Sequence, residues 1–128
     1  MSRGDDRERG SAVAEFAMVA ALLSVLFLGV LQVAFTMHVR NTLISCAAEG
    51  ARYGARLGSS PAEGADRTRE LIAASLADSY ASGVSAGTGV AGGVEVVVVR
   101  VHAPVPVLGI YGVGADFDLV GRAFQEGQ

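Results

Sequence analysis

The chain has 128 residues, is 51% apolar and carries a formal net charge of −3 at pH 7. Its ten basic residues are all arginines scattered among acids, which excludes the continuous basic stripe of a nucleic-acid-binding protein. A single cysteine, Cys46, excludes an intramolecular disulfide framework and is interpreted as a small apolar helix residue.

A long uncharged segment lies near the start of the chain. From Phe16 to Val39 no residue carries a formal charge, and Gln32 and His38 are its most polar members. A helix that crosses the hydrocarbon core needs about 20 apolar residues, at about 1.5 Å per residue. A cleaved secretory signal would have a shorter apolar region, of about 7 to 15 residues, with a small-x-small cleavage site at its end. This run is longer and has no convincing site, so the sequence predicts a retained transmembrane helix over residues 11–39.

The charges that flank this span do not orient it. Acidic residues count little in the positive-inside rule, so the comparison depends on the arginines on each side. Three precede the span and three follow it closely: Arg3, Arg7 and Arg9 on one side, and Arg40, Arg52 and Arg56 on the other. The charges alone therefore leave the orientation open.

One carboxylate, that of Glu15, stands at the upstream edge of the span. In the first turns of a helix that begins near Ser11, it would interact favourably with the helix dipole. The same helix enters lipid, where a carboxylate costs roughly 2.5 kcal/mol or more at the bilayer centre, and intramembrane acids are functional candidates. A cut between Gly10 and Ser11 would supply an α-amino group, with Glu15 at position five of the new chain. Such a pair belongs to one helix or to two neighbouring subunits.

Beyond Val39 the helix is predicted to continue to about Gly58. Gly50, Gly54 and Gly58 recur every four residues in this extension. Each glycine weakens a helix by roughly 1 kcal/mol relative to alanine, so a stripe of glycines makes sense where another element packs very close. These three residues are a candidate helix-packing ridge. The sequence leaves open whether the ridge serves a partner protein or whether this part of the helix is an ordinary solvated surface.

Two segments resemble a known family. The stretch from Arg9 to Phe16, which reads RGSAVAEF, resembles a prepilin processing site, with glycine before the cut and Glu and Phe at positions five and six after it. The helix from Asn41 to Arg56, rich in Ala, Gly and Arg, follows the span directly. This arrangement is similar to the TadE-like proteins of tight-adherence (Flp) pilus systems. The resemblance covers about residues 9–56.

The resemblance implies a minor pilin or pseudopilin-like component in the assembly of a bacterial tight-adherence pilus or a related secretion apparatus. It implies a leader over residues 1–10 and cleavage by an aspartic prepilin peptidase, on the cytoplasmic side, between Gly10 and Ser11. Glu15 and Phe16 would take part in subunit pairing. The implied partners are the peptidase, other pilins and pseudopilins, membrane platform proteins and the lipid bilayer, with no nucleic acid.

By the same resemblance, the N-terminus lies in the cytoplasm and residues 40–128 lie outside the cytoplasmic membrane. These residues are rich in Ala and Gly and can bury only a small core, so the domain is expected to depend on a partner. Ser60 and Glu63 fit a capping box ahead of a second helix, which is predicted to end near Tyr80. Pro61 suits the first helical position.

The C-terminal third is predicted to contain strands. Residues 82–93 are rich in glycine and predict a flexible linker. The stretch Val94–Val105 has the strongest strand pattern of the chain, and Asp116–Phe124 alternates polar and apolar residues. A lone hairpin is barely stable, so these strands should form a hairpin that rests on the helices. The predicted class is α+β: a long transmembrane helix extended outside the membrane, a second helix, and a small C-terminal hairpin or sheet.

No catalytic, cofactor-binding or metal-binding constellation emerges from the sequence, and an enzyme is not expected. His38 borders the span and His102 ends a strand, so both are interpreted as interface or surface residues. Asp116 and Asp118 share one side of a strand, where a solvated edge is the simpler interpretation. One alternative to a pilin stays open: an uncleaved, single-span, signal-anchored protein whose extracytoplasmic domain binds a ligand or partner.

Overall fold

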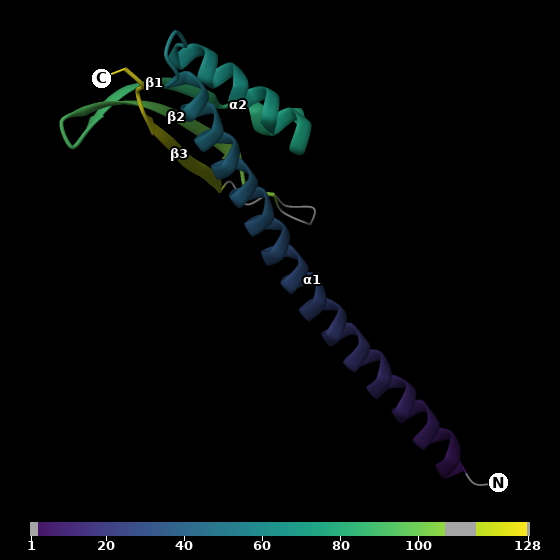
Figure 1. Cartoon of the computed structure of the whole chain (residues 1–128). Helices are drawn as coiled ribbons and strands as arrows, with labels where there is room; N and C mark the ends of the chain where they lie inside the picture. Colours follow the sequence, from purple (N-terminus) through teal and green to yellow (C-terminus); the bar gives the residue numbers. More distant parts are fainter. Residues whose placement is uncertain (1–2, 107–114, 128) are drawn as a thin grey trace. The chain divides into compact units, whose positions relative to one another are not determined.

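The structure is a computed structural model that describes residues 3–106 and 115–127 (Figure 1). The predicted α+β class is confirmed, because a long N-terminal helix is followed by a second helix and a small antiparallel sheet. The chain divides into two compact units, Met1–Ala34 and Phe35–Gln128. The first contains the N-terminal part of the long helix, and the second contains the rest of that helix, the other helices and the sheet.

The first helix, α1, extends from Arg3 to Gly54 and has 52 residues. Its start lies upstream of Ser11, the residue at which the sequence suggested that the helix begins. Two aspartates in the first turn complement the positive end of the helix dipole, and no proline interrupts the chain. It ends before the predicted boundary at Gly58. That glycine has a φ of 84°, a left-handed conformation that an α-helix does not contain.

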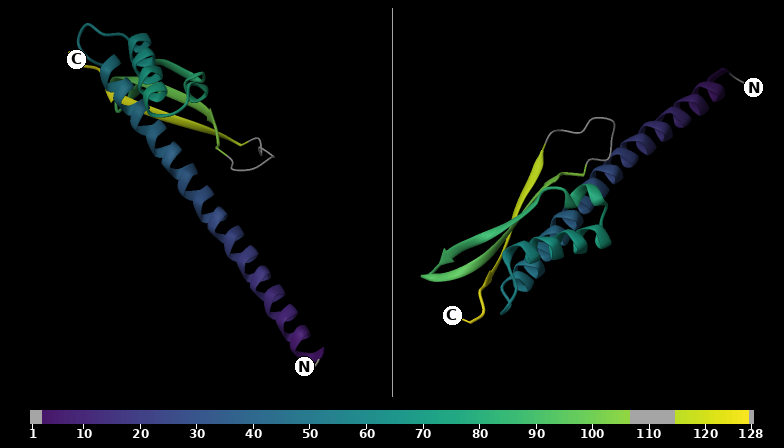
Figure 2. Two further views of the ribbon diagram at one scale, coloured as in Figure 1. Left: turned by 90° about the vertical axis from the view of Figure 1, so that its right-hand side faces the viewer. Right: turned by 90° about the horizontal axis from the view of Figure 1, so that it is seen from above.

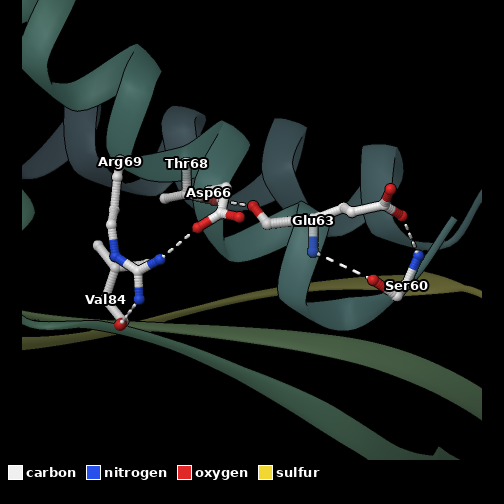
Figure 3. Close-up of polar contacts among 7 residues, drawn as sticks. Ser60, Glu63, Asp66, Thr68, Arg69 and Val84 are labelled. Carbon is white, nitrogen blue, oxygen red and sulfur yellow. Dashed lines mark hydrogen bonds and ion pairs between the residues drawn. The ribbon is translucent and has the colours of Figure 1, made fainter.

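The second helix, α2 (Pro61–Ser75), begins at the predicted capping box (Figure 3). The backbone N–H of Glu63 donates to the hydroxyl of Ser60 at 3.2 Å, and the backbone N–H of Ser60 donates to the Glu63 carboxylate at 2.7 Å. The helix stops before its predicted end because Leu76 takes an extended backbone conformation. A short 3-10 helix, η1 (Asp78–Ala81), follows.

The flexible linker predicted over residues 82–93 is wrong. Strand β1 (Val84–Ala91) occupies most of this stretch and pairs antiparallel with β2 (Val94–Pro104). Gly92 and Gly93 form the turn between them, with φ of 59° and 80°, which suits a tight two-residue hairpin. Glycine content suggested flexibility, but pairing with the valine-rich β2 satisfies the backbone hydrogen bonds of this strand.

The predicted hairpin of the two C-terminal strands is confirmed. Strand β3 (Asp116–Phe124) pairs antiparallel with β2, with Val99 opposite Gly121. The strand order is β1-β2-β3, so β2 is central and its neighbours are both edge strands. Figure 2 shows that the β1–β2 hairpin extends past the helices of the second unit.

The core of the second unit lies between one face of the sheet and the helices. Val97, Val99 and Val101 alternate along β2 and are buried on this inner face. Leu43 from the C-terminal part of α1 and Ile72 from α2 pack in the same cluster and are both 0% exposed. The other set of β2 side chains, at the even positions, lies on the opposite face, called here the outer face.

Candidate functional site

The predicted processing and pairing residues all lie in the first unit, on α1. Gly10 and Ser11 are helical and exposed, and a Cβ atom at Gly10 would meet no atom within 4 Å. Glu15 is exposed, and so is Phe16, at 75% of its surface. Since residues four apart are neighbours on a helix surface, an amino group created at Ser11 would lie on the same face as the Glu15 carboxylate.

The helix that carries these residues is apolar on every side. Leu22, Val25 and Phe27 are 69%, 67% and 66% exposed, and at about 100° per residue they point in three different directions. Burying one such side chain is worth about 1.5–3 kcal/mol, so this surface requires an apolar environment. Within the described part of the chain, α1 is the one helix long and apolar enough to cross a membrane. These properties fit a membrane-anchored protein.

Two of the three glycines in the candidate packing ridge lie against α2. A Cβ atom at Gly50 would overlap the hydroxyl of Thr68 and lie 2.6 Å from the carbonyl oxygen of Gly64. A Cβ atom at Gly54 would lie 3.2 Å from the Cα of Gly64. Gly58 lies beyond the end of α1, and its Cβ position has no atom within 4 Å. Gly50 and Gly54 therefore permit a close helix–helix contact inside the chain.

A second close contact, which the sequence analysis did not anticipate, joins β3 to α1. A Cβ atom at Gly121 would overlap the backbone carbonyl group of Ala47 and lie 2.6 Å from the backbone nitrogen of Ala48. Gly121 is buried, so its lack of a side chain sets the distance between the strand and the helix. An isolated glycine in an alternating strand pattern is the signal that could have indicated this contact.

Three polar side chains, those of His102, Asp116 and Asp118, meet at one end of the outer face. His102 lies opposite Asp118 in the β2–β3 register, and its Nδ1 is 2.8 Å from a carboxylate oxygen of that residue. The Nε2 atom of His102 is 3.3 Å from a carboxylate oxygen of Asp116. The hydrogen bond to Asp118, together with the negative charges of both aspartates, raises the pKa of His102.

This histidine should make the stability of the second unit depend on pH. Its pKa in the folded state is raised above the ordinary value of 6.5, so its stabilising contribution is present below that pH and is lost as the pH rises through the folded-state value. An NMR titration should give His102 a pKa above 6.5, and Asp118→Asn should lower it. The thermal midpoint of the parent protein should fall relative to that of His102→Asn as the pH rises. An ordinary pKa in the parent protein would contradict the prediction.

Other reactive side chains are dispersed in the fold. Within residues 3–106 and 115–127, no group of three or more His, Cys, Asp or Glu side chains is placed to hold a metal ion. The thiol of Cys46 is buried in the core of the second unit, and burial raises its pKa. A raised pKa lowers the fraction of reactive thiolate, which agrees with a packing role for this residue.

Comparison with known families gives one match. The family model described as TadE-like protein matches residues 10–52. The match begins at Gly10 and includes the apolar run and most of the helix that follows it, so it confirms the resemblance to TadE-like proteins in this part of the chain. It indicates a component associated with the Tad pilus, which works with other parts of the pilus machinery. Comparisons with curated proteins and with solved structures gave no match.

Proposed function

We propose, from the TadE-like match over residues 10–52, that the protein is a minor pilin or pseudopilin-like component that functions in the assembly of a tight-adherence pilus or a related secretion apparatus. A prepilin peptidase cleaves it between Gly10 and Ser11 at the cytoplasmic face of the inner membrane. The second unit then lies outside that membrane. The observation that carries this proposal is that an accessible Gly10–Ser11 bond, an exposed Glu15 and an apolar helix lie together within the matched segment.

Glu15 provides the pairing contact in this proposal. After cleavage, the amino group of Ser11 is positive and the carboxylate of Glu15 is negative. The two groups lie one helical turn apart in one subunit, and the exposed Glu15 is also accessible to the amino group of a neighbouring copy. An unpaired carboxylate is costly near the hydrocarbon core, so pairing favours the association of neighbouring helices. Phe16 and the apolar surface beyond it supply further contact area.

The protein acts by assembly and has no catalytic role in this proposal. Its partners are the peptidase, other pilins and pseudopilins, and the membrane platform proteins of the machinery. The distribution of apolar surface supports this assignment, because large exposed apolar side chains are concentrated on the first unit. The second unit has a small core rich in Val and Ala, and such domains are commonly stabilised by a partner.

Replacing Glu15 with alanine should separate processing from assembly. Glu15→Ala removes the carboxylate but leaves the Gly10–Ser11 bond and the apolar surface intact. We expect normal cleavage, together with at least a roughly tenfold lower recovery of the variant in pull-downs of the pilus machinery, since one charged pair near lipid is lost. The measurement combines intact mass with quantitative recovery from bacteria that express the whole system.

A matched control is Glu49→Ala, which removes a partly exposed acid from the same helix in the second unit. This variant should be recovered at the parent level. Recovery of Glu15→Ala at the parent level would remove the pairing role from the proposal, and an equal loss in both variants would show that the effect is not specific to the membrane edge.

A further inference from the structure

The outer face of the sheet contains a groove along the β1–β2 hairpin. The groove has a volume of about 360 Å³, which is within the range of ligand-binding pockets, about 300–1,000 Å³. The strand register places Gly87 opposite Val98 and Gly89 opposite Val96, so these four residues share the face. We call this cavity the arginine groove; it is defined by Gly87, Gly89, Val96, Val98, Arg100 and Arg122.

The groove exists because β1 contributes glycine where a side chain would otherwise lie. A Cβ atom at Gly87 would meet no atom within 4 Å, which shows open space directly above that residue. Val96 and Val98 are only 3% and 9% exposed, although they lie on the face that the helices do not cover. The floor is therefore apolar and closely packed, and the open space of the groove lies at Gly87.

Two arginines line the groove, and neither has a carboxylate partner among the residues that the structure describes. Arg100 lies opposite Val120, and Arg122 lies opposite Val98, so the two arginines are diagonal neighbours, with Cα atoms roughly 7–8 Å apart. No carboxylate in the described residues lies within ion-pair distance of either guanidinium group. In contrast, Arg69 is paired, with Asp66 at 2.7 Å and the carbonyl oxygen of Val84 at 2.8 Å (Figure 3).

The acids nearest in the sheet already have a partner. Asp116 and Asp118 lie further along the outer face, where both contact His102. The like charges of two neighbouring arginines repel each other. The N–H donors of a guanidinium group match the geometry of a planar carboxylate, which can accept two parallel hydrogen bonds. Since neither arginine forms an ion pair within the described residues, an acidic group of another molecule would supply a charge complement for this pair.

The shape of the groove favours an extended peptide over a compact small molecule. Consecutive residues from Ser85 to Ala91 line it, so it follows β1 for nearly the length of that strand. We propose that the arginine groove binds an extended segment of a partner protein through one acidic side chain, held between Arg100 and Arg122, with small apolar neighbours along β1 at Gly87. This interaction lies in the second unit and is independent of cleavage at Gly10.

The test uses the full chain in micelles of a nonionic detergent. The probe is the peptide acetyl-Ala-Val-Glu-Val-Ala-amide, compared with the same peptide containing Gln in place of Glu and with free glutarate. NMR titration of the backbone amides of Gly87 and Gly89 reports binding. The Glu peptide should bind at least about tenfold more tightly than either comparison ligand, because charge-assisted bidentate contacts and apolar contacts both contribute.

Three variants assign the effect to the groove. Arg100→Gln and Arg122→Gln should each weaken binding of the Glu peptide by at least about tenfold. Gly87→Val leaves the charges in place but fills the groove, and it should also abolish binding. Arg56→Gln, which removes an exposed arginine stacked on Tyr53 at the end of α1, is the matched control and should bind as the parent does.

Several results would overturn the proposal. Equal binding of the Glu and Gln peptides would show that the carboxylate is not recognised, and equal binding of glutarate would show that no peptide segment is required. Unchanged binding by Gly87→Val would place the ligand outside the groove. The absence of amide shifts at Gly87 and Gly89 in the parent protein, at peptide concentrations of several mM, would rule out this site.

Discussion

Coexpression with an active prepilin peptidase should convert the full chain into a product that begins at Ser11, and Gly10→Leu should abolish this conversion. Gly10 has no side chain, so a protease can approach its backbone closely. Glycine also weakens a helix by roughly 1 kcal/mol relative to alanine, which makes local unwinding of the bond easier. Intact-mass spectrometry distinguishes the two chain lengths directly.

Gly29→Leu is the matched control for this experiment. Gly29 also lies in α1, and its Cβ position, like that of Gly10, has no atom within 4 Å. Neither substitution should therefore disturb packing within the chain. Gly29→Leu should be processed like the parent protein. If only the full-length chain is found in the presence of the active peptidase, the uncleaved, signal-anchored binding protein becomes the better explanation.

Gly121→Ala should destabilise the second unit by about 1–3 kcal/mol or more, the cost typical of an overpacked core. The new methyl group would overlap the backbone carbonyl group of Ala47, and backbone in the middle of a helix cannot move aside as a side chain can. The helix and the strand would have to separate, which would open the contact between α1 and the sheet. Urea unfolding of the full chain in detergent, followed by tyrosine fluorescence, measures this loss.

Gly87→Ala is the control for that measurement, because it makes the same chemical change in the other edge strand of the sheet, β1. The Cβ position of Gly87 is open, and alanine reduces the conformational freedom of the unfolded chain, so its stability should be equal to or slightly above that of the parent. If both alanine variants unfolded at the same urea concentration, the close contact between β3 and α1 would not limit stability.

Local patterns were sufficient to predict several elements. The uncharged run from Phe16 to Val39 predicted a long apolar helix, which α1 contains, because a continuous apolar segment is read directly from the sequence. Ser60 and Glu63 predicted the start of α2, since a capping box needs only residues three positions apart. The valine-rich stretch and the alternating stretch predicted β2 and β3 in the same way. The family resemblance also depended on a contiguous segment, about residues 9–56, and the family model matches residues 10–52.

The tertiary structure decided the features that depend on contacts between distant segments. The glycine-rich composition of residues 82–93 predicted a linker, whereas most of this stretch forms β1 because it pairs with β2. The sequence suggested a glycine ridge, but only the packing of α1 on α2 showed which glycines need to be small. The His102 cluster and the arginine groove depend on strand register, which places residues far apart in sequence side by side. Such contacts form only when the strands pair in one register, because a shift of one residue would move these side chains to opposite faces of the sheet.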